Sequence, residues 1–130
     1  MKLRVLEGEY AVCRLGALAD TPDVPPRGTG FWSLTEVGEE RSLVCLEDLV
    51  EDAAWAEGAT VVRGWRILEV LGPLDFALTG IMAAVAVPLA EAGVSIFPIA
   101  TYDTDWVLVP GATLGLAVEA LRGAGHEVAG

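Results

Sequence analysis

The 130-residue chain has little of the material from which metal and catalytic centres are built. His126 is its one histidine, and Cys13 and Cys45 are its two cysteines, far apart and without a CxxC pair. The sequence offers no zinc ligand set, no GxSxG nucleophile motif and no glycine-rich phosphate loop. We therefore expect no metal, no cofactor and no catalytic residue. The cysteines lie in apolar strand-like runs, which predicts buried free thiols, and His126 is expected to be solvated.

Basic residues are also scarce. The chain has 8 lysines and arginines against 19 aspartates and glutamates, and its net charge is −11. Binding to a phosphate backbone or to an anionic membrane surface needs clustered basic side chains, and the sequence shows no such cluster. The charge balance therefore predicts no nucleic acid and no membrane as a partner.

The sequence lacks a hydrophobic run long enough to cross a membrane. Its longest uncharged stretch, between Asp75 and Glu91, falls short of the roughly 20 residues that a transmembrane helix needs. Lys2 and Arg4 are followed by acidic residues before any long apolar stretch, which is not the pattern of a signal peptide. Together with free thiols, which suit a reducing compartment, these features predict a soluble, cytoplasmic protein.

Hydrophobic residues, in contrast, are plentiful. They make up 53% of the chain, charged residues make up 21%, and the mean hydropathy is +0.50. This composition is typical of a globular protein with a large interior. The apolar surplus predicts that a second copy of the chain covers part of the surface, as in a homodimer.

The N-terminal half is predicted to consist mainly of strands. Strand-like runs occupy residues 10–15, 31–37, 41–47 and 59–71, and Gly64 marks a break or bulge in the last of them. Residues 19–30 are rich in proline, glycine and aspartate, which predicts a loop. Residues 46–58 show helical spacing of apolar side chains, which predicts a short helix that Gly58 ends.

The C-terminal half has a clearer pattern. A strand over residues 65–71 precedes a helix that is expected to start near Asp75, to kink at Pro88 and to end at Gly93. Strands over 94–100 and 104–110, a helix over 112–125 and a short strand over 126–128 follow. The order strand, helix, strand, strand, helix, strand is typical of the ferredoxin-like fold, an antiparallel sheet with two helices on one face.

A weak internal similarity links the two halves. Polar turn residues lead into an apolar strand at 35–44 and again at 101–109, and a helix is predicted after each hairpin. We therefore predict an α+β chain of two ferredoxin-like βαββαβ units with antiparallel sheets. The N-terminal unit is expected at residues 1–64 and the C-terminal unit at residues 65–130.

Four segments carry a resemblance to a known family: GPLDFALTGI, LAEAGVSIFPIATYDTDWVLV, ALRGAGHEV and LTEVGEERSLVC. Through them the chain resembles, from Tyr10 to Val128, the small proteins of two ACT-like units related to the CASTOR-type cytosolic arginine sensors of animals. Residues 72–109 are the most specific part. The resemblance implies a regulatory module that binds an amino acid, usually where one ACT domain meets another. The sequence contains no catalytic domain and half as many ACT-like units as the animal sensors.

The first part of the expected ligand site is the loop and helix start in the C-terminal half. Unpaired amide groups at a helix start attract a carboxylate, glycines let a ligand approach the backbone, and threonine offers a hydroxyl. The residues assigned here are Gly72, Asp75, Leu78, Thr79 and Gly80. A structural interpretation remains open, in which Asp75 caps the helix and Gly80 permits close packing. The resemblance favours a site, because ACT domains commonly hold amino acids at this loop.

The second part of the expected site is the polar hairpin turn at residues 101–105. Aspartate and threonine in such a turn usually bond their own backbone, which would explain the turn without a ligand. Carboxylates here would also suit an ammonium group or a cationic side chain, through charge-assisted hydrogen bonds of roughly 1.5–3 kcal/mol each. The residues assigned are Thr101, Asp103 and Asp105, with Val94, Ser95 and Ile96 of the adjoining strand as lining.

Two functions are consistent with these features. The first is a non-catalytic regulatory or sensor domain that binds an amino acid, forms a homodimer and controls a partner protein. The alternative is a structural protein–protein interaction module that keeps the ACT-like fold without a ligand. An enzyme has little support, because no acid, base and nucleophile form a recognisable set.

Overall fold

The computed structural model describes residues 1–16, 28–51, 53–72 and 79–130 of the chain, which forms two compact units. The C-terminal unit combines residues 1–7 with residues 66–130, and the N-terminal unit spans residues 8–65. The sequence predicted a division between residues 64 and 65, with residues 1–7 in the N-terminal unit. The structure differs in those first residues, because they form a strand of the C-terminal sheet.

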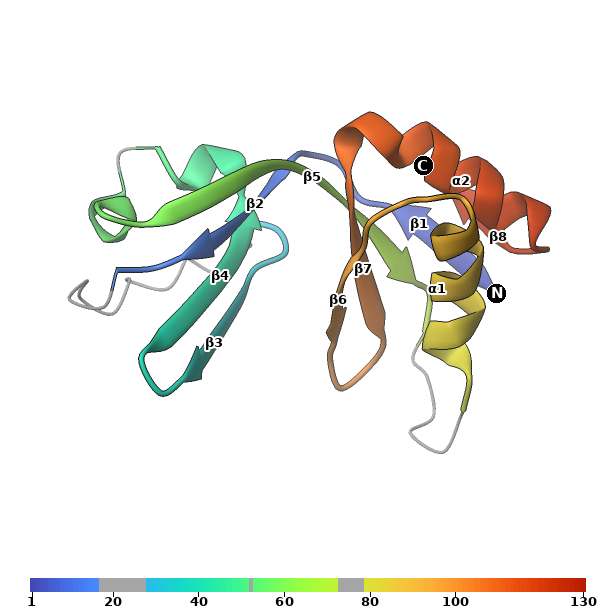
Figure 1. The fold of residues 1–130 in the computed structure, drawn as a ribbon, viewed down its shortest axis with the longest axis horizontal. Helices are drawn as coiled ribbons and strands as arrows, with labels where there is room; N and C mark the ends of the chain where they lie inside the picture. The colour runs from blue at the N-terminus through green and yellow to red at the C-terminus, as the bar shows by residue number, and fades with distance from the viewer. Residues whose placement is uncertain (17–27, 52, 73–78) are drawn as a thin grey trace. The chain divides into compact units, whose positions relative to one another are not determined.

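The C-terminal unit is a sheet with two helices (Figure 1). Its strands are β1 (Lys2–Val5), the second half of β5 (Thr60–Val70), β6 (Phe97–Ala100), β7 (Asp105–Pro110) and β8 (Glu127–Ala129). Strand β5 pairs with β1 and β7, while β6 pairs with β7 and β8 pairs with β1. The helices are α1 (Ile81–Glu91) and α2 (Leu114–Gly123), and the short 3-10 helix η3 (Gly111–Thr113) precedes α2. From β5 to β8, the elements follow the predicted order.

Strand β1 lies between β5 and β8, antiparallel to the first and parallel to the second. Its Leu3 pairs with Val70 and Val128 and is 1% exposed, whereas the flanking Lys2 and Arg4 are exposed. This alternation is expected of a strand with one buried face. Sequence analysis missed the strand because two apolar residues in four are too few to show a period.

The core of the C-terminal unit joins both helices to the sheet. Helix α1 contributes Val85 and Leu89, and α2 contributes Ala117 and Leu121. Each pair is four residues apart and therefore lies on one face of its helix. These side chains are 0% exposed, and they pack with the strand residues Leu3, Leu68, Val70, Val107, Val109 and Val128. The removal of this apolar surface from water stabilises the unit.

Helix α1 begins later than the sequence predicted. Its first residue is Ile81, and Thr79 and Gly80 lie outside it. Gly80 has a φ of 75°, a left-handed conformation that glycine adopts readily and that breaks a right-handed helix. The predicted helix was therefore wrong at residues 79 and 80, and Asp75 lies outside the described residues.

Pro88 lies inside α1 and lacks the N–H group that would bond the carbonyl of Ala84. In its place, Nε2 of His126 lies 2.9 Å from the Ala84 oxygen, and Nδ1 of the same ring lies 3.0 Å from the Met1 amino group. Because a carbonyl can only accept, the ring proton belongs on Nε2, and Nδ1 accepts from the amino group. The expectation of a merely solvated His126 was wrong, since the ring links α1 to β1.

The loss of His126 should reduce stability more when Pro88 is present than when it is replaced. We expect His126→Ala to lower the free energy of unfolding by about 1 kcal/mol, the usual net contribution of one hydrogen bond. In a Pro88→Ala background this cost should be smaller, because the N–H of residue 88 then donates to Ala84 and only the hydrogen bond with the Met1 amino group is lost. Urea unfolding of the four proteins in this double-mutant cycle measures the difference. Equal costs in both backgrounds would contradict the assignment.

The N-terminal unit contains four strands and, among its described residues, no α-helix. Strands β3 (Ser33–Val37), β4 (Glu40–Leu46), β2 (Tyr10–Arg14) and the first half of β5 pair in that order, close to the predicted positions. Two 3-10 helices, η1 (Glu47–Leu49) and η2 (Ala54–Ala56), replace the helix predicted over 46–58. That prediction was wrong because Ala53 has an extended backbone, and valine and aspartate in this segment favour helix only weakly.

Gly64 forms the predicted bulge in β5. The register between β2 and β5 shifts there, since Tyr10 pairs with Trp65 but Val12 pairs with Val62. Gly64 has a φ of 85°, and its N–H donates to the Glu47 carboxylate over 2.6 Å. The bulge therefore ties β5 to η1.

Cys13 and Cys45 are buried and free, as predicted. Cys13 pairs with Leu43 and Ala11 with Cys45, so the two thiols are diagonal neighbours on one face of the sheet. The hydrogen bond with Cys45 lowers the pKa of Cys13, whereas the hydrogen bond with Cys13 and burial raise the pKa of Cys45. The pair belongs to the core cluster of the N-terminal unit.

Candidate functional site

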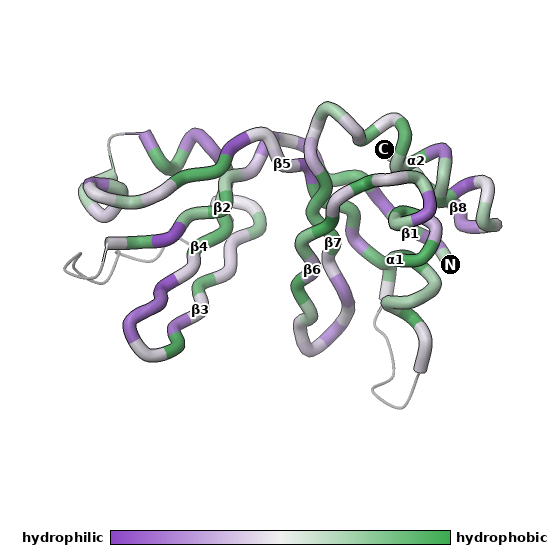
Figure 2. The backbone as a smooth tube through the Cα atoms, in the orientation of Figure 1, coloured by the Kyte–Doolittle hydropathy of each residue, from purple (hydrophilic) through white to green (hydrophobic). Residues whose placement is uncertain are grey.

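The turn between β6 and β7 is held by its own threonines. The N–H and Oγ1 of Thr101 donate to the Thr104 carbonyl over 2.9 and 3.0 Å. Nε1 of Trp106 donates to Oγ1 of Thr101 over 2.9 Å. Figure 2 shows hydrophilic residues at this turn, next to strand segments that are largely hydrophobic. The turn therefore keeps its conformation through internal hydrogen bonds, as such polar residues commonly do.

Thr104 connects this turn to the end of β5. It is 6% exposed and is the one buried polar side chain found in the described ranges. Its hydroxyl donates to the carbonyl of Val70, the last residue of β5. A buried hydroxyl needs such a partner to offset its loss of hydration. The hydrogen bond places the turn beside the end of β5, two residues before Gly72.

The start of α1 faces the same end of the unit. In Figure 1, the beginning of α1 and the β6–β7 turn lie at one end of the C-terminal unit. Gly80 makes no side-chain capping hydrogen bond, and the first turn of α1 contains no acidic residue. Among the described residues, the first amide groups of α1 thus lack the side-chain acceptor that often satisfies one of them.

The aspartates of the turn bring negative charge to this end of the unit. Asp103 is exposed and Asp105 is half-buried. No ion pair joins either carboxylate to a lysine or arginine in the described part of the chain. Helix-start amides attract a carboxylate, and free aspartates attract an ammonium or guanidinium group. The arrangement therefore suits a small molecule that carries both charges.

The structure brings most of the predicted site residues together but separates one group. At the end just described lie Gly72, Thr79, Gly80, Thr101, Asp103 and Asp105. Val94, Ser95 and Ile96 instead follow the other end of α1, and this 11-residue helix spans roughly 16 Å. The expectation that they line a pocket beside the helix start was wrong within one chain, because β6 begins at the far end and runs back to the turn. Asp75 and Leu78 lie outside the described residues.

Two aromatic residues at this end were not among the predicted site residues. Trp106 orients Thr101 through the hydrogen bond given above, and Tyr102 is 80% exposed in the turn. An exposed tyrosine offers an apolar ring and a polar hydroxyl to a ligand or partner. The position of Tyr102 inside a polar turn is the sequence signal that could have identified it as a site residue.

In the described ranges, no group of three His, Cys, Asp or Glu side chains is placed to hold a metal ion. The same ranges contain no helix with both the length and the apolar character needed to cross a bilayer. The polar groups at the end of the C-terminal unit are carboxylates, hydroxyls and backbone amides.

Sequence comparisons relate the chain to regulatory proteins. A family model described as the ACT domain matches residues 60–123. The cytosolic arginine sensor for mTORC1 subunit 1 from Bos taurus is 33% identical over 97 residues, a match that covers 70% of this chain and 30% of the sensor. The chain therefore spans less than a third of the length of that relative.

Structural comparisons find solved proteins with a similar fold. Protein Atu0741 from Agobacterium tumefaciens superposes with a TM-score of 0.84 at 35% identity, covering 98% of this chain and 90% of that protein. The ligand-free regulatory subunit of aspartate kinase from Thermus thermophilus gives a TM-score of 0.64 at 14% identity, with coverage of 94% and 95%. At that identity, the second likeness concerns the fold alone.

Proposed function

Because the chain is an ACT-domain protein related to the cytosolic arginine sensors, we propose that it is a non-catalytic regulatory domain that binds an amino acid. The observation that carries this proposal is the start of α1, which no side chain of the described residues caps, at the same end of the unit as Asp103 and Asp105. The amide N–H groups would donate to the carboxylate of the ligand, and the aspartate carboxylates would accept from its ammonium group. The name of the bovine relative supports a cytoplasmic location.

Arginine is the first ligand to test. The bovine relative is named as an arginine sensor, and the turn presents two aspartates without a cationic partner among the described residues. A guanidinium group donates in a planar fork that matches a carboxylate, so it would add to the attraction of the ammonium group.

A melting experiment with three related ligands tests this proposal. At a tenfold excess over its Kd, arginine should stabilise the folded state by about 1.4 kcal/mol and raise the Tm by about 3–6 °C. Citrulline has a neutral side chain and agmatine has no carboxylate, so each should give a smaller shift. If arginine has no effect, the other common amino acids follow in the same assay.

Matched variants locate the effect. Asp103→Asn combined with Asp105→Asn should abolish the ligand-induced shift, because both replacements keep the shape and remove the charge. Asp48→Asn is the control, since Asp48 is an exposed aspartate of the N-terminal unit. A shift that survives the double replacement puts the site elsewhere. A flat response to every amino acid favours the interaction module.

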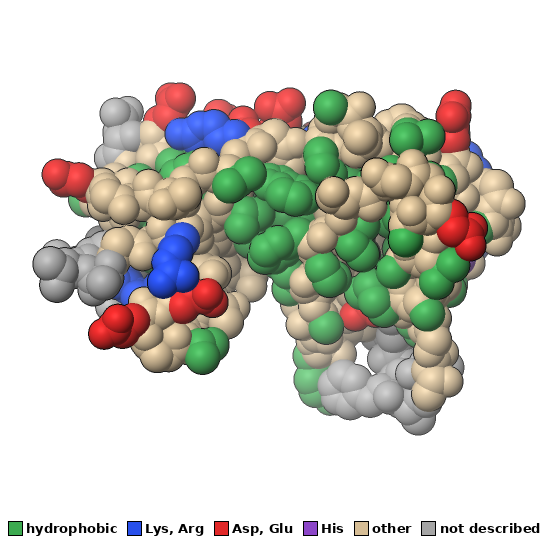
Figure 3. All heavy atoms as spheres, in the orientation of Figure 1, with side chains coloured by type: hydrophobic (Ala, Val, Ile, Leu, Met, Phe, Trp, Pro, Cys, Tyr) green, Lys and Arg blue, Asp and Glu red, His purple; other side chains and the backbone are tan. Residues whose placement is uncertain are grey.

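We further propose that a second copy of the chain completes the site. Figure 3 shows hydrophobic side chains spread over the C-terminal unit on the face it draws. Among the described residues of this unit, the exposed large hydrophobic ones are Leu71, Val87, Tyr102 and Leu116. A homodimer would cover part of this surface, and it could bring Ser95 of one copy to the helix start of the other. Sedimentation of the ligand-bound protein should give the mass of two chains, and a single-chain mass at all concentrations would contradict the dimer.

The N-terminal unit is proposed to be a second ACT-like unit. In the sheet of the N-terminal unit, the strands lie side by side in the order β3, β4, β2, β5. In chain order, these are the second, third, first and fourth strands of the unit. In the C-terminal unit, the strands lie in the order β6, β7, β5, β1, β8. When its strands are counted from β5, the order is again second, third, first and fourth, with β1 inserted between the first and the fourth. The shared order supports an internal duplication in which β5 serves both units.

A further inference from the structure

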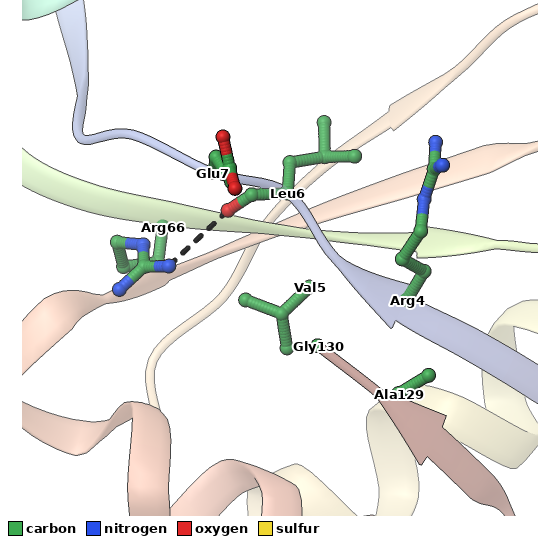
Figure 4. A pocket seen from close by; sticks show the side chains of 7 residues that line it. All are labelled: Arg4, Val5, Leu6, Glu7, Arg66, Ala129 and Gly130. Carbon is green, nitrogen blue, oxygen red and sulfur yellow. Dashed lines mark hydrogen bonds between the residues drawn. The ribbon is translucent and has the colours of Figure 1, made fainter.

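Two adjoining hollows lie in the C-terminal unit, away from the site proposed above. The first, of about 500 Å³, is lined by residues 4–7 at the end of β1, by Arg66 and by Ala129 and Gly130 (Figure 4). The second, of about 440 Å³, shares Val5, Arg66, Ala129 and Gly130 and adds residues of α2. Each volume falls in the range of known small-molecule pockets.

Arg66 is the polar side chain that both hollows share. Its Nη2 donates to the carbonyl of Leu6 over 3.2 Å, as Figure 4 shows. Its Nε is buried and has no hydrogen-bond partner in the described part of the chain. No ion pair to Arg66 occurs among the described residues, although Arg4 nearby is paired with Glu69. A half-buried guanidinium group without a carboxylate partner is unusual, because proteins normally pair such charges.

The surroundings of Arg66 favour a negative group. Arg122 of α2 lines the second hollow and uses one amino group on the Val128 carbonyl over 2.8 Å. The first turn of α2 also lines it through Leu114 and Gly115, and the N-cap residue Thr113 makes no side-chain capping hydrogen bond, while its Oγ1 donates to the Pro110 carbonyl. Two guanidinium groups and the positive end of a helix dipole thus meet at one hollow.

The size and sign of the ligand charge follow from the remaining lining. Glu7 lines the first hollow and Glu119 the second, and both are exposed. Their charge, in a chain of net charge −11, opposes a doubly charged phosphate more than a single carboxylate. The aliphatic side chains of Val5, Leu114 and Val118 provide an apolar wall for a short hydrocarbon chain.

We infer that the paired hollow is a second binding site, for a small aliphatic monocarboxylate held by Arg66. It is distinct from the proposed amino-acid site, because Arg66 and the Thr104-bonded Val70 are separated along β5 by roughly 13 Å. The carboxylate would take the free donors of the guanidinium group, and the hydrocarbon chain would lie against Val5 and Val118.

Three probes with one carbon skeleton test the inference: isovalerate, isovaleramide and isoamylamine. In ¹⁵N-labelled protein, isovalerate should shift the amide signals of Gly115 and Gly130 and the Nε–H signal of Arg66. The neutral amide and the cationic amine should leave these signals unchanged. An amide that binds as tightly as the carboxylate would overturn the inference, and so would leucine binding at the same residues at least as tightly as isovalerate.

Arginine variants test whether Arg66 binds the carboxylate of the ligand. Arg66→Gln should weaken isovalerate binding by about tenfold or more, and Arg122→Gln by a smaller factor. Arg14→Gln, an exposed arginine of the N-terminal unit, makes the same chemical change outside the hollow and should leave the Kd unchanged. Arg122→Gln keeps the test valid if Arg66→Gln disturbs β1, because Arg122 does not contact Leu6. Wild-type affinity in folded Arg66→Gln, or in both variants, would contradict the proposed site.

Discussion

Leu3→Ala is expected to lower the free energy of unfolding of the C-terminal unit by about 2–5 kcal/mol, the range for leucine truncation in a packed core. Leu3 is 1% exposed and packs with residues that the sequence places more than sixty positions away, among them Leu68 and Val128. The effect should appear in residues 66–130, because β1 pairs with β5 and β8 of that unit. Amide hydrogen exchange locates the loss of protection.

Leu116→Ala is the matched control for this experiment. It makes the same chemical change in the same unit, but Leu116 is 46% exposed on α2, so in the single-chain form its stability effect should stay within about 0.5 kcal/mol. If Leu3→Ala instead accelerated exchange only in residues 8–65, residues 1–7 would not belong to the C-terminal unit.

Thr104→Val is the second substitution with a large expected effect. The shape of the side chain is kept, but the donor to the Val70 carbonyl is lost, which should cost about 1–3 kcal/mol. The same change should displace the β6–β7 turn from the end of β5 and weaken binding of any amino acid at Asp103 and Asp105. Denaturant unfolding measures the first effect, and a titration with the ligand measures the second.

Thr104→Ser separates the hydroxyl from the methyl group. Serine keeps the donor and loses one methyl, so its cost should be about 1 kcal/mol or less. The serine variant should therefore be more stable than the valine variant. The reverse order would show that Thr104 acts through packing and not through its hydrogen bond.

The sequence predicted the C-terminal fold well because its elements are long and strongly patterned. The runs that became β5, β7 and α2 carry enough apolar residues to show a period, and glycines mark their ends. Strand β1 was not predicted, because its partner strands lie far along the chain and its four residues are too few to show an alternating pattern. Only the three-dimensional pairing with β5 and β8 shows where it belongs.

Two helix predictions, which were based on local sequence patterns, were wrong. The apolar spacing over 46–58 resembled a helix, but two 3-10 helices formed, and Glu47 instead bonds to the N–H of Gly64 on β5. The helix predicted from residue 75 included residues 79 and 80, whereas the left-handed Gly80 sets the start of α1. Both errors arise because a tertiary hydrogen bond and the left-handed backbone of a single residue cannot be predicted from the spacing of apolar residues.

The candidate site was predicted in part for a similar reason. Polar turn residues and a glycine before an apolar helix can be recognised from sequence, which located Gly80, Thr101 and Asp103. The order of elements alone did not show that residues 94–96 lie at the other end of α1. Nor did it show Arg66 as a shared wall of two hollows, since a single arginine in a strand gives no pattern.

One measurement tests the central proposal most directly: a ¹H–¹⁵N titration of the wild-type chain with the amino acid that raises the Tm. Binding at the proposed site should shift the backbone amides of Ile81, Met82 and Ala83 together with those of Asp103 and Asp105, at a single Kd. Saturable shifts confined to other residues, with the first turn of α1 unmoved, would contradict an amino-acid site between the helix start and the β6–β7 turn.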